Sequence, residues 1–171
     1  MGSSPHTHDR PKVYSFGMEF LTKESLRIVH VDDDTDFLAL GERSLKRAGF
    51  ERPIVRCTDG MAALDYFSTV QADHAPHVIL VDLHMPRLNG LGVLHWVRTK
   101  YRHKNVAVYL LTSSENSAVI NRAIADGVTA YLPKHTLFDC LVEKLDQFIR
   151  AHNQRQAASA PASNFASATQ Q

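Results

Sequence analysis

The sequence predicts a doubly wound α/β fold, in which a parallel five-stranded sheet carries helices on both faces. Short apolar, β-branched runs alternate five times with segments whose apolar residues recur at helical spacing, at intervals of roughly 20–30 residues. Such βαβ units are joined by right-handed crossovers and build parallel sheets. The run at residues 78–81, VILV, is apolar throughout, as expected of a strand that is covered on both faces.

The composition is that of a soluble globular domain. Of the 171 residues, 44% are hydrophobic and 22% are charged. Lys and Arg number 19 against 18 Asp and Glu, so no charge excess indicates nucleic acid or an anionic membrane as a partner. We find no run of membrane-spanning length and no signal peptide, and we expect a cytoplasmic protein. Cys57 and Cys140 have no metal-ligand spacing and are expected to be reduced and partly buried.

The two ends of the chain differ from its middle. Residues 1–25 are expected to form an N-terminal extension, residues 26–150 the folded domain, and residues 151–171 the end of the last helix and a disordered tail. Apolar residues at 13–16 and 20–21 leave two alternatives for the extension. It docks on the domain or on a dimer partner, or it is disordered with an apolar patch.

The first two strand and helix units are expected within residues 26–67. A buried strand at 26–31 leads to a helix at 35–48, which Gly49 ends. A second strand at 53–57 leads to a helix capped by Thr58. The apolar positions assigned to the faces of these two helices include Leu38, Leu40, Leu45, Met61 and Phe67.

The third unit begins with the strand at 78–81, which ends at Asp82. Pro86 rules out its continuation as a central strand, and Asn89-Gly90 supplies a cap for a helix that runs to Tyr101. Residues 106–111 are expected to form the fourth strand.

The last two units follow the same pattern. Ser113 or Ser114 is expected to cap a helix that Gly127 ends, and residues 128–132 form the fifth strand. Thr136 with Asp139 resembles a capping box that opens the last helix.

Polar residues follow four of the predicted strands. They are Asp32 and Asp33, Asp82, Thr112, and Lys134. Parallel strands end at one edge of the sheet, and if the first and third strands are neighbours, three carboxylates crowd one crevice. Such crowding raises pKa values and repels unless a cation is present, and hard oxygen ligands suit Mg²⁺.

This set of residues is suited to phosphoryl transfer. A metal and Lys134 would neutralise the charge of a transferring phosphoryl group, Asp82 would attack it to form an acyl phosphate, and Thr112 would hydrogen-bond its oxygens. Each residue taken singly has an ordinary alternative: Lys134 is a surface lysine, Thr112 is a helix cap, and Asp34 and Asp36 are acids of a helix start. The convergence on one edge favours the chemical interpretation.

The chain from residue 26 to residue 150 resembles the receiver domain of two-component response regulators. The matching segments are IVHVDDD at 28–34, VILVDLHMPRLNG at 78–90, VYLLTSS at 108–114 and DGVTAYLPK at 126–134. The resemblance implies the flavodoxin-like (βα)5 fold of the chemotaxis protein CheY, with strand order 2-1-3-4-5. It also implies a signalling phosphoacceptor rather than an enzyme.

The resemblance implies a Mg²⁺ site. Asp33 and Asp82 would ligate the ion directly, together with the backbone carbonyl of His84, and Asp32 would act mainly through water. His84, two residues after Asp82, also occupies a position that, in this family, tunes the rate at which phosphate is lost.

The resemblance also assigns the residues around the phosphoryl group. Asp82 would be the phosphoacceptor, and Thr112 and Lys134 would contact the phosphoryl group. Tyr131 would be the aromatic switch that turns inward when Thr112 moves. The chain departs from the family at His135, where proline usually follows the lysine.

Partners are implied as well. The phosphate donor would be a sensor histidine kinase or a phosphotransfer protein. The Thr112-Ser113-Ser114 sequence and the absence of an attached output domain resemble stand-alone regulators of the phytochrome-associated type, which adds a phytochrome kinase to the expected donors. Output would pass through protein contact or a homodimer, using the face of the fourth helix, fifth strand and fifth helix.

Two other functions use the same architecture. A Mg²⁺-dependent phosphatase would use Asp82 as its nucleophile, but such enzymes typically place a second acid two residues later, where this chain has His84. A flavin or nucleotide binder would need a glycine-rich phosphate loop after the first strand, where Asp32, Asp33 and Asp34 would repel phosphate.

Overall fold

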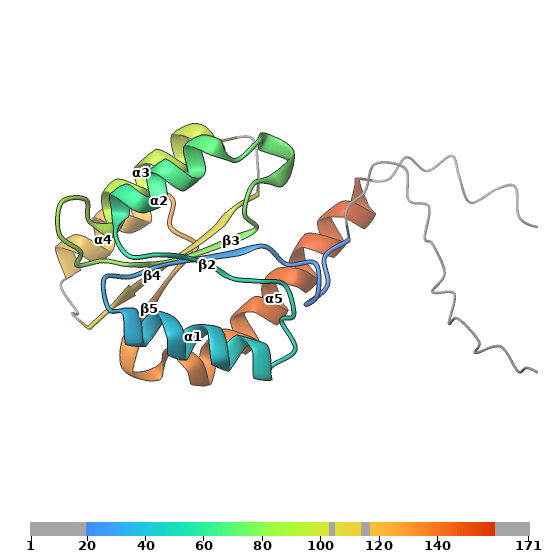
Figure 1. The fold of residues 1–171 in the computed structure, drawn as a ribbon. Coiled ribbons are helices and arrows are strands. Elements are labelled where there is room, and N and C mark those ends of the chain that lie inside the picture. Colours follow the sequence, from blue (N-terminus) through green and yellow to red (C-terminus); the bar gives the residue numbers. More distant parts are fainter. Residues whose placement is uncertain (1–19, 103–104, 114–116, 160–171) are drawn as a thin grey trace, which may run out of the picture.

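The computed structural model describes residues 20–102, 105–113 and 117–159, and confirms the predicted architecture (Figure 1). A parallel five-stranded sheet has the order β2-β1-β3-β4-β5. The strands are β1 (Ile28–Val31), β2 (Val55–Cys57), β3 (Val78–Asp82), β4 (Ala107–Thr112) and β5 (Ala130–Pro133). The helices are α1 (Thr35–Arg47), α2 (Gly60–Thr69), α3 (Gly90–Lys100), α4 (Ser117–Ala125) and α5 (Leu137–Ala158), with the short 3-10 turns η1 (Ala72–His74) and η2 (Lys134–Thr136).

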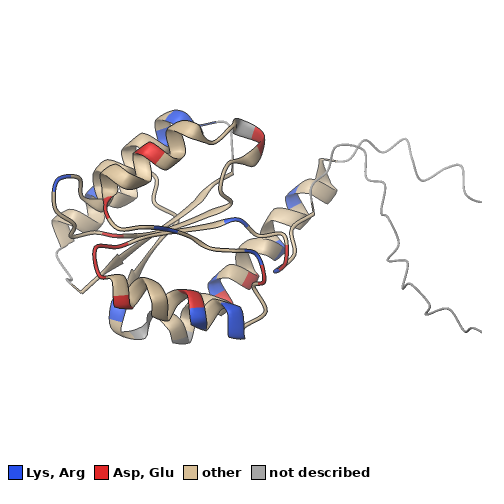
Figure 2. Ribbon diagram, in the orientation of Figure 1, with Lys and Arg blue, Asp and Glu red and all other residues tan. Residues whose placement is uncertain are grey.

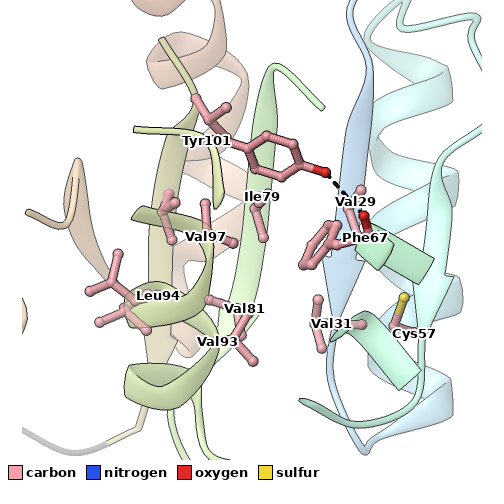
Figure 3. Packing of buried hydrophobic residues seen from close by; sticks show 14 of the residues in the cluster. Val29, Val31, Cys57, Phe67, Ile79, Val81, Val93, Leu94, Val97 and Tyr101 are labelled. Atoms are coloured by element: carbon pink, nitrogen blue, oxygen red, sulfur yellow. Dashed lines mark hydrogen bonds between the residues drawn. The ribbon is translucent and has the colours of Figure 1, made fainter. Parts of the chain in front are cut away.

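Helices cover both faces of the sheet. Figure 1 shows α1 and α5 on one face and α2, α3 and α4 on the other. Successive side chains of a strand point to opposite faces, so each strand contributes to two cores. The core beneath α2 and α3, drawn in Figure 3, includes Val29, Val31, Ile79, Val81 and Leu94. The core on the α1 and α5 face includes Ile28, Leu80, Tyr109, Leu111 and Leu141.

The strand register brings the strand ends to one edge. Val31 lies opposite Val81, so Asp32 and Asp82 follow paired positions on neighbouring strands. Thr112 is paired with Pro133, which directly precedes Lys134. The sheet therefore brings to one edge the polar residues that the sequence placed at the strand ends.

Helix starts are capped by acidic or amide side chains. Asp34 caps α1, accepting hydrogen bonds from the amides of Asp36 and Phe37 at 2.9 and 3.0 Å. The predicted cap Thr58 is wrong, because Asp59 occupies the capping position of α2 and accepts from the Ala62 amide at 2.8 Å. A carboxylate adds a favourable charge at the positive end of a helix, which a hydroxyl does not.

Several other helix ends bear on the predictions. Asn89 caps α3 as predicted, accepting from the Gly92 amide at 3.0 Å. Gly49, at a φ of +89°, follows the end of α1, in a conformation that glycine adopts without steric cost. α4 begins at Ser117; of its two predicted caps, Ser113 lies four residues before that start and Ser114 lies outside the described structure. The predicted capping box relies on the side chains of Thr136 and Asp139, which also lie outside the described part of the structure.

The fifth strand and two helix faces differ from expectation. β5 begins at Ala130 rather than Val128, because the Val128 amide still bonds to the Ala123 carbonyl in the last turn of α4. Leu40 and Met61 are 43% and 42% exposed, since the buried positions of their helices lie on the opposite side. Helical propensity and spacing place such residues on a helix without fixing its rotation.

Residues 20–26, here called the N-terminal strap, dock on α5. Leu21 is buried, and its amide and carbonyl both bond to the side-chain amide of Asn153, at 2.8 and 2.9 Å. Lys23 donates to the Ala48 carbonyl at 3.2 Å and lies 3.4 Å from a carboxylate oxygen of Asp146. The docking alternative therefore holds for these residues, while residues 1–19 lie outside the described structure.

Cys57 is buried and Cys140 is half-buried, and both are free thiols. Within the described ranges, no helix combines the length and the apolar character needed to cross a membrane.

Candidate functional site

Three carboxylates meet where β1 and β3 end. Asp32 is completely buried and Asp82 is 4% exposed, while Asp33 is exposed. One oxygen from each of the three side chains lies within 4.8 Å of the others. Figure 2 shows acidic segments, in red, gathered at the left edge of the sheet, where α1 begins. The predicted convergence of Asp32, Asp33 and Asp82 is thus present.

Lys134 joins this cluster from the end of β5. Its Nζ lies 2.8 Å from Oδ2 of Asp32 and 3.1 Å from Oδ2 of Asp82. The same Nζ lies 4.9 Å from the ring centre of Phe37, on α1, in a cation–π contact. These contacts place the cation between the two buried carboxylates.

The charges of the cluster depend on one another. Burial raises the pKa of Asp32, with a contribution from the neighbouring charge of Asp82, and this outweighs the opposing hydrogen bonds from Lys134 and from the Asp34 amide. Burial opposes the charge on Lys134, but the hydrogen bonds and charges of Asp32 and Asp82 together raise its pKa. The lysine therefore stays protonated and partly compensates two buried acids.

Thr112, Tyr131 and His84 lie around the cluster at different depths. Thr112, at the end of β4, is 1% exposed. Tyr131, on β5 next to β4, has a buried hydroxyl that meets no hydrogen-bond partner among the described residues. His84 is exposed, two residues after Asp82. Thr112 is therefore part of the buried edge, and His84 faces solvent.

The donor set fits a small divalent cation. Carboxylate oxygens are the ligands that Mg²⁺ prefers, and the ion keeps several waters, which suits a cluster whose third acid, Asp33, is open to solvent. Apart from its ion pair with Lys134, Oδ2 of Asp32 has no hydrogen-bond partner in the described structure. A cation at the cluster would offset the repulsion among the three acids.

The loop between β3 and α3 forms one wall of this edge. Its ends meet closely, since the Gly90 amide donates to the Leu83 carbonyl at 3.1 Å and a Cβ on Gly90 would lie 2.4 Å from the Asp82 carbonyl oxygen. Arg87, in this loop, forms an ion pair with Asp59 at the start of α2. Neither this ion pair nor the contact of Phe37 with Lys134 is predictable from the sequence, because the partners form no local motif.

Comparison with known proteins gives matches over the same part of the chain. A sequence profile of the response regulator receiver domain matches residues 28–146. The probable methanogenesis regulatory protein FilR2 of Methanothrix harundinacea is 30% identical over 122 residues, which are 70% of this chain and 79% of that protein. The chemotaxis protein CheY1 of Helicobacter pylori is 26% identical over 121 residues, 71% of this chain and 94% of that protein.

Solved structures agree with these matches. The receiver domain of the putative response regulator NarL from Mycobacterium tuberculosis superimposes with a TM-score of 0.64 at 26% identity, over 74% of this chain and 98% of that one. The chemotaxis protein CheY4 of Vibrio cholerae gives a TM-score of 0.62 at 24% identity, over 72% and 98%, and supports the fold alone. The profile match extends from β1 to the middle of α5, and none of these matches supports a phosphatase.

Proposed function

The chain belongs to the response regulator receiver domain family, whose members are phosphoacceptor signalling modules, and on this basis we propose that Asp82 is its phosphoacceptor. The observation that carries the assignment is the position of Asp82 at the end of β3, beside two further acids and 3.1 Å from Lys134. Histidine kinases or phosphotransfer proteins are the donors that the family implies.

In the proposed reaction an oxygen of Asp82 attacks the phosphorus of a phosphohistidine. The P–N bond breaks, the imidazole leaves, and an acyl phosphate forms on Asp82. Lys134, held between Asp32 and Asp82, offsets charge on the phosphoryl oxygens, and Thr112 donates a hydrogen bond to one of them. This protein is proposed to act as a stoichiometric phosphoacceptor, not as an enzyme that turns over a substrate.

Asp33, Asp82 and the backbone carbonyl of His84 are proposed to ligate Mg²⁺ directly, and Asp32 through water. When bound, the ion supplies charge neutralisation for the transfer. The cluster of acids within 4.8 Å supports this set.

Thr112 and Tyr131 are proposed to report phosphorylation to the surface. Thr112 would move toward the phosphoryl group, and the unpartnered Tyr131 hydroxyl supports a side chain that can rearrange. The output surface is proposed to be α4, β5 and α5, with homodimerisation as one outcome. Ile124 on α4, 63% exposed, supports an apolar contact there.

Within the donor class, a phytochrome kinase is the first candidate to test, supported by the Thr112-Ser113-Ser114 sequence. The balance of 19 basic against 18 acidic residues supports protein partners rather than nucleic acid or membrane. Two free thiols support a cytoplasmic location.

The test is phosphorylation by a small phosphodonor with Mg²⁺. We expect about one acid-stable, base-labile phosphate per chain, and none in Asp82→Asn. Asp33→Asn should slow labelling strongly, and wild type without Mg²⁺ should behave like that variant. Undiminished labelling of Asp82→Asn would refute the assignment, and multiple turnover of phosphate esters would favour a hydrolase.

A further inference from the structure

Arg87 holds an unusual backbone conformation in the loop between β3 and α3. Its φ is 66°, and the amide of Leu88 donates to the carbonyl of Pro86 at 2.8 Å. A hydrogen bond from residue i+2 to residue i around a positive φ defines a γ-turn, which is rare and strained for a residue other than glycine. Such strain persists only where surrounding contacts hold it.

The contact that holds Arg87 is the ion pair with Asp59. The Arg87 side chain is 65% exposed, but that of Asp59 is only 14% exposed and is already fixed, because its other oxygen caps α2 by accepting from the Ala62 amide. The guanidinium therefore binds to an anchored carboxylate rather than to a mobile one. The ion pair thus constrains Arg87 from outside its own loop.

The loop transmits its position to the acidic site through backbone contacts. A Cβ on Gly60 would lie 2.3 Å from the Leu88 carbonyl oxygen, so the start of α2 and the γ-turn are packed backbone to backbone. Gly90, where the loop ends, is packed just as closely against the carbonyl oxygen of Asp82, where the loop begins. Met85, which lies in the loop between these two residues, is buried in the core. A movement of the γ-turn would therefore shift the backbone of residues 82–84.

We propose that the Asp59–Arg87 ion pair is a positioning device for the metal site, which keeps the γ-turn closed and thereby holds the backbone around His84 in the arrangement that binds Mg²⁺. This inference depends on the proposed function, since it concerns the same acidic cluster. Arg87 and Asp59 are positioning residues and touch neither the metal nor the phosphoryl group.

The test compares a variant that loses only the ion pair with one that loses the ion pair but gains a glycine suited to the turn. Asp59→Asn removes the ion pair but keeps the cap of α2, since asparagine and aspartate cap helices equally well. Arg87→Gly removes the pair as well, but glycine takes a positive φ without help. The four proteins, wild type, both single variants and the double variant, are titrated with Mg²⁺ while backbone amide shifts are followed by NMR.

We expect Asp59→Asn to weaken Mg²⁺ binding about three- to fivefold, the size expected of one exposed ion pair. Arg87→Gly should bind Mg²⁺ within about twofold of wild type, because the turn survives. In the Arg87→Gly background, Asp59→Asn should have no further effect. Urea unfolding without Mg²⁺ should show all four proteins folded, which makes the affinities comparable.

The outcomes distinguish this inference from the proposed function. Wild type that binds no Mg²⁺ would overturn the proposed function and this inference with it. Wild type that binds Mg²⁺ while Asp59→Asn binds equally well would overturn the positioning role alone. An equal loss from Asp59→Asn in both backgrounds would also overturn it, since the lost charge would then act through space.

Discussion

His30 is a polar residue in an apolar setting. It lies on β1, is completely buried, and neither ring nitrogen has a hydrogen-bond partner among the described residues. Burial, helped by the charge of Lys134, lowers its pKa to about 4, so the ring is neutral near pH 7. A Cβ on Gly41 would lie 2.9 Å from this ring, so α1 packs directly against it.

Replacing His30 by leucine should therefore stabilise the fold. Each unsatisfied buried polar group costs about 1–3 kcal/mol, and we expect His30→Leu to raise the free energy of unfolding in urea at pH 7 by about that amount. The exposed His95 on α3 provides the control, because His95→Leu should change stability by less than about 0.5 kcal/mol. An unchanged or lower stability of His30→Leu would show that the ring has a favourable role in packing.

The sequence predicts which residues converge at this edge of the sheet but not their surroundings. Asp32, Asp82, Thr112 and Lys134 were predictable because each ends a strand or directly follows one, and parallel strands share an edge. The cap of α2 was assigned one residue too early, to Thr58 in place of Asp59. No local pattern links residues 59 and 87, whose contact depends on tertiary structure.

At the scale of elements, the N-terminal strap and α5 stabilise each other. The Asn153 side chain bonds to both backbone groups of Leu21, and the two residues are 132 positions apart in sequence. α5 continues well past Asn153, to Ala158, and Figure 1 shows this end of the helix beyond the sheet. The strap therefore supports the projecting end of α5.

Asn153→Ala should remove this support. With two hydrogen bonds lost at about 0.5–1.5 kcal/mol each, we expect a decrease of about 1–3 kcal/mol in the free energy of unfolding, measured in urea. Gln147→Ala on the same helix, which loses one exposed bond to Glu143, should cost less than about 0.5 kcal/mol. Equal effects of the two substitutions would mean that the strap contributes nothing.

Element boundaries were predictable where a residue type enforces them. Gly49 and Asn89 mark helix ends through conformation and capping, and both were assigned correctly. The start of β5 was not predictable, because Val128 looks like a strand residue but its amide bonds back to the Ala123 carbonyl of α4. The sequence does not decide between docking and disorder for the strap, because its partner on α5 is distant in sequence.

At the scale of the whole molecule, several protons are held more tightly in the fold than outside it. Burial, followed by the charge of Asp59, raises the pKa of the Cys57 thiol from 9.0 to about 11. Burial also raises the pKa values of the Tyr66, Tyr101 and Tyr109 hydroxyls. Burial alone would lower the pKa of Lys134, but its ion pairs with Asp32 and Asp82 raise this pKa. All these shifts have the same sign.

The free energy of unfolding should therefore fall as the pH rises above about 9. Between pH 9 and 11 the unfolded chain releases protons that the folded chain retains, and Cys57 alone accounts for about 2–3 kcal/mol of the fall. Urea unfolding at several pH values measures this.

Cys57→Ala should lessen the fall by that amount, whereas Cys140→Ala, at the half-buried thiol on α5, should leave it unchanged. A fall of the same size in Cys57→Ala as in wild type would contradict the assignment.

The global fold was predictable because local and long-range patterns agree. Five apolar runs alternate with helical periods, and the buried strands β1, β3 and β4 are apolar nearly throughout. The fold class follows from those patterns alone, whereas the strand order was stated only through the family resemblance. Packing angles, helix rotation and the strap required the structure.

The two edges of the sheet have a consequence for behaviour at high concentration. β2 has three residues and β5 four, the last of them Pro133, which lacks an amide to donate. Short edge strands and proline deny another chain a template for strand pairing. Strand pairing between copies of this protein is therefore disfavoured at both edges of the sheet, and so is its growth into amyloid-like aggregates at high concentration.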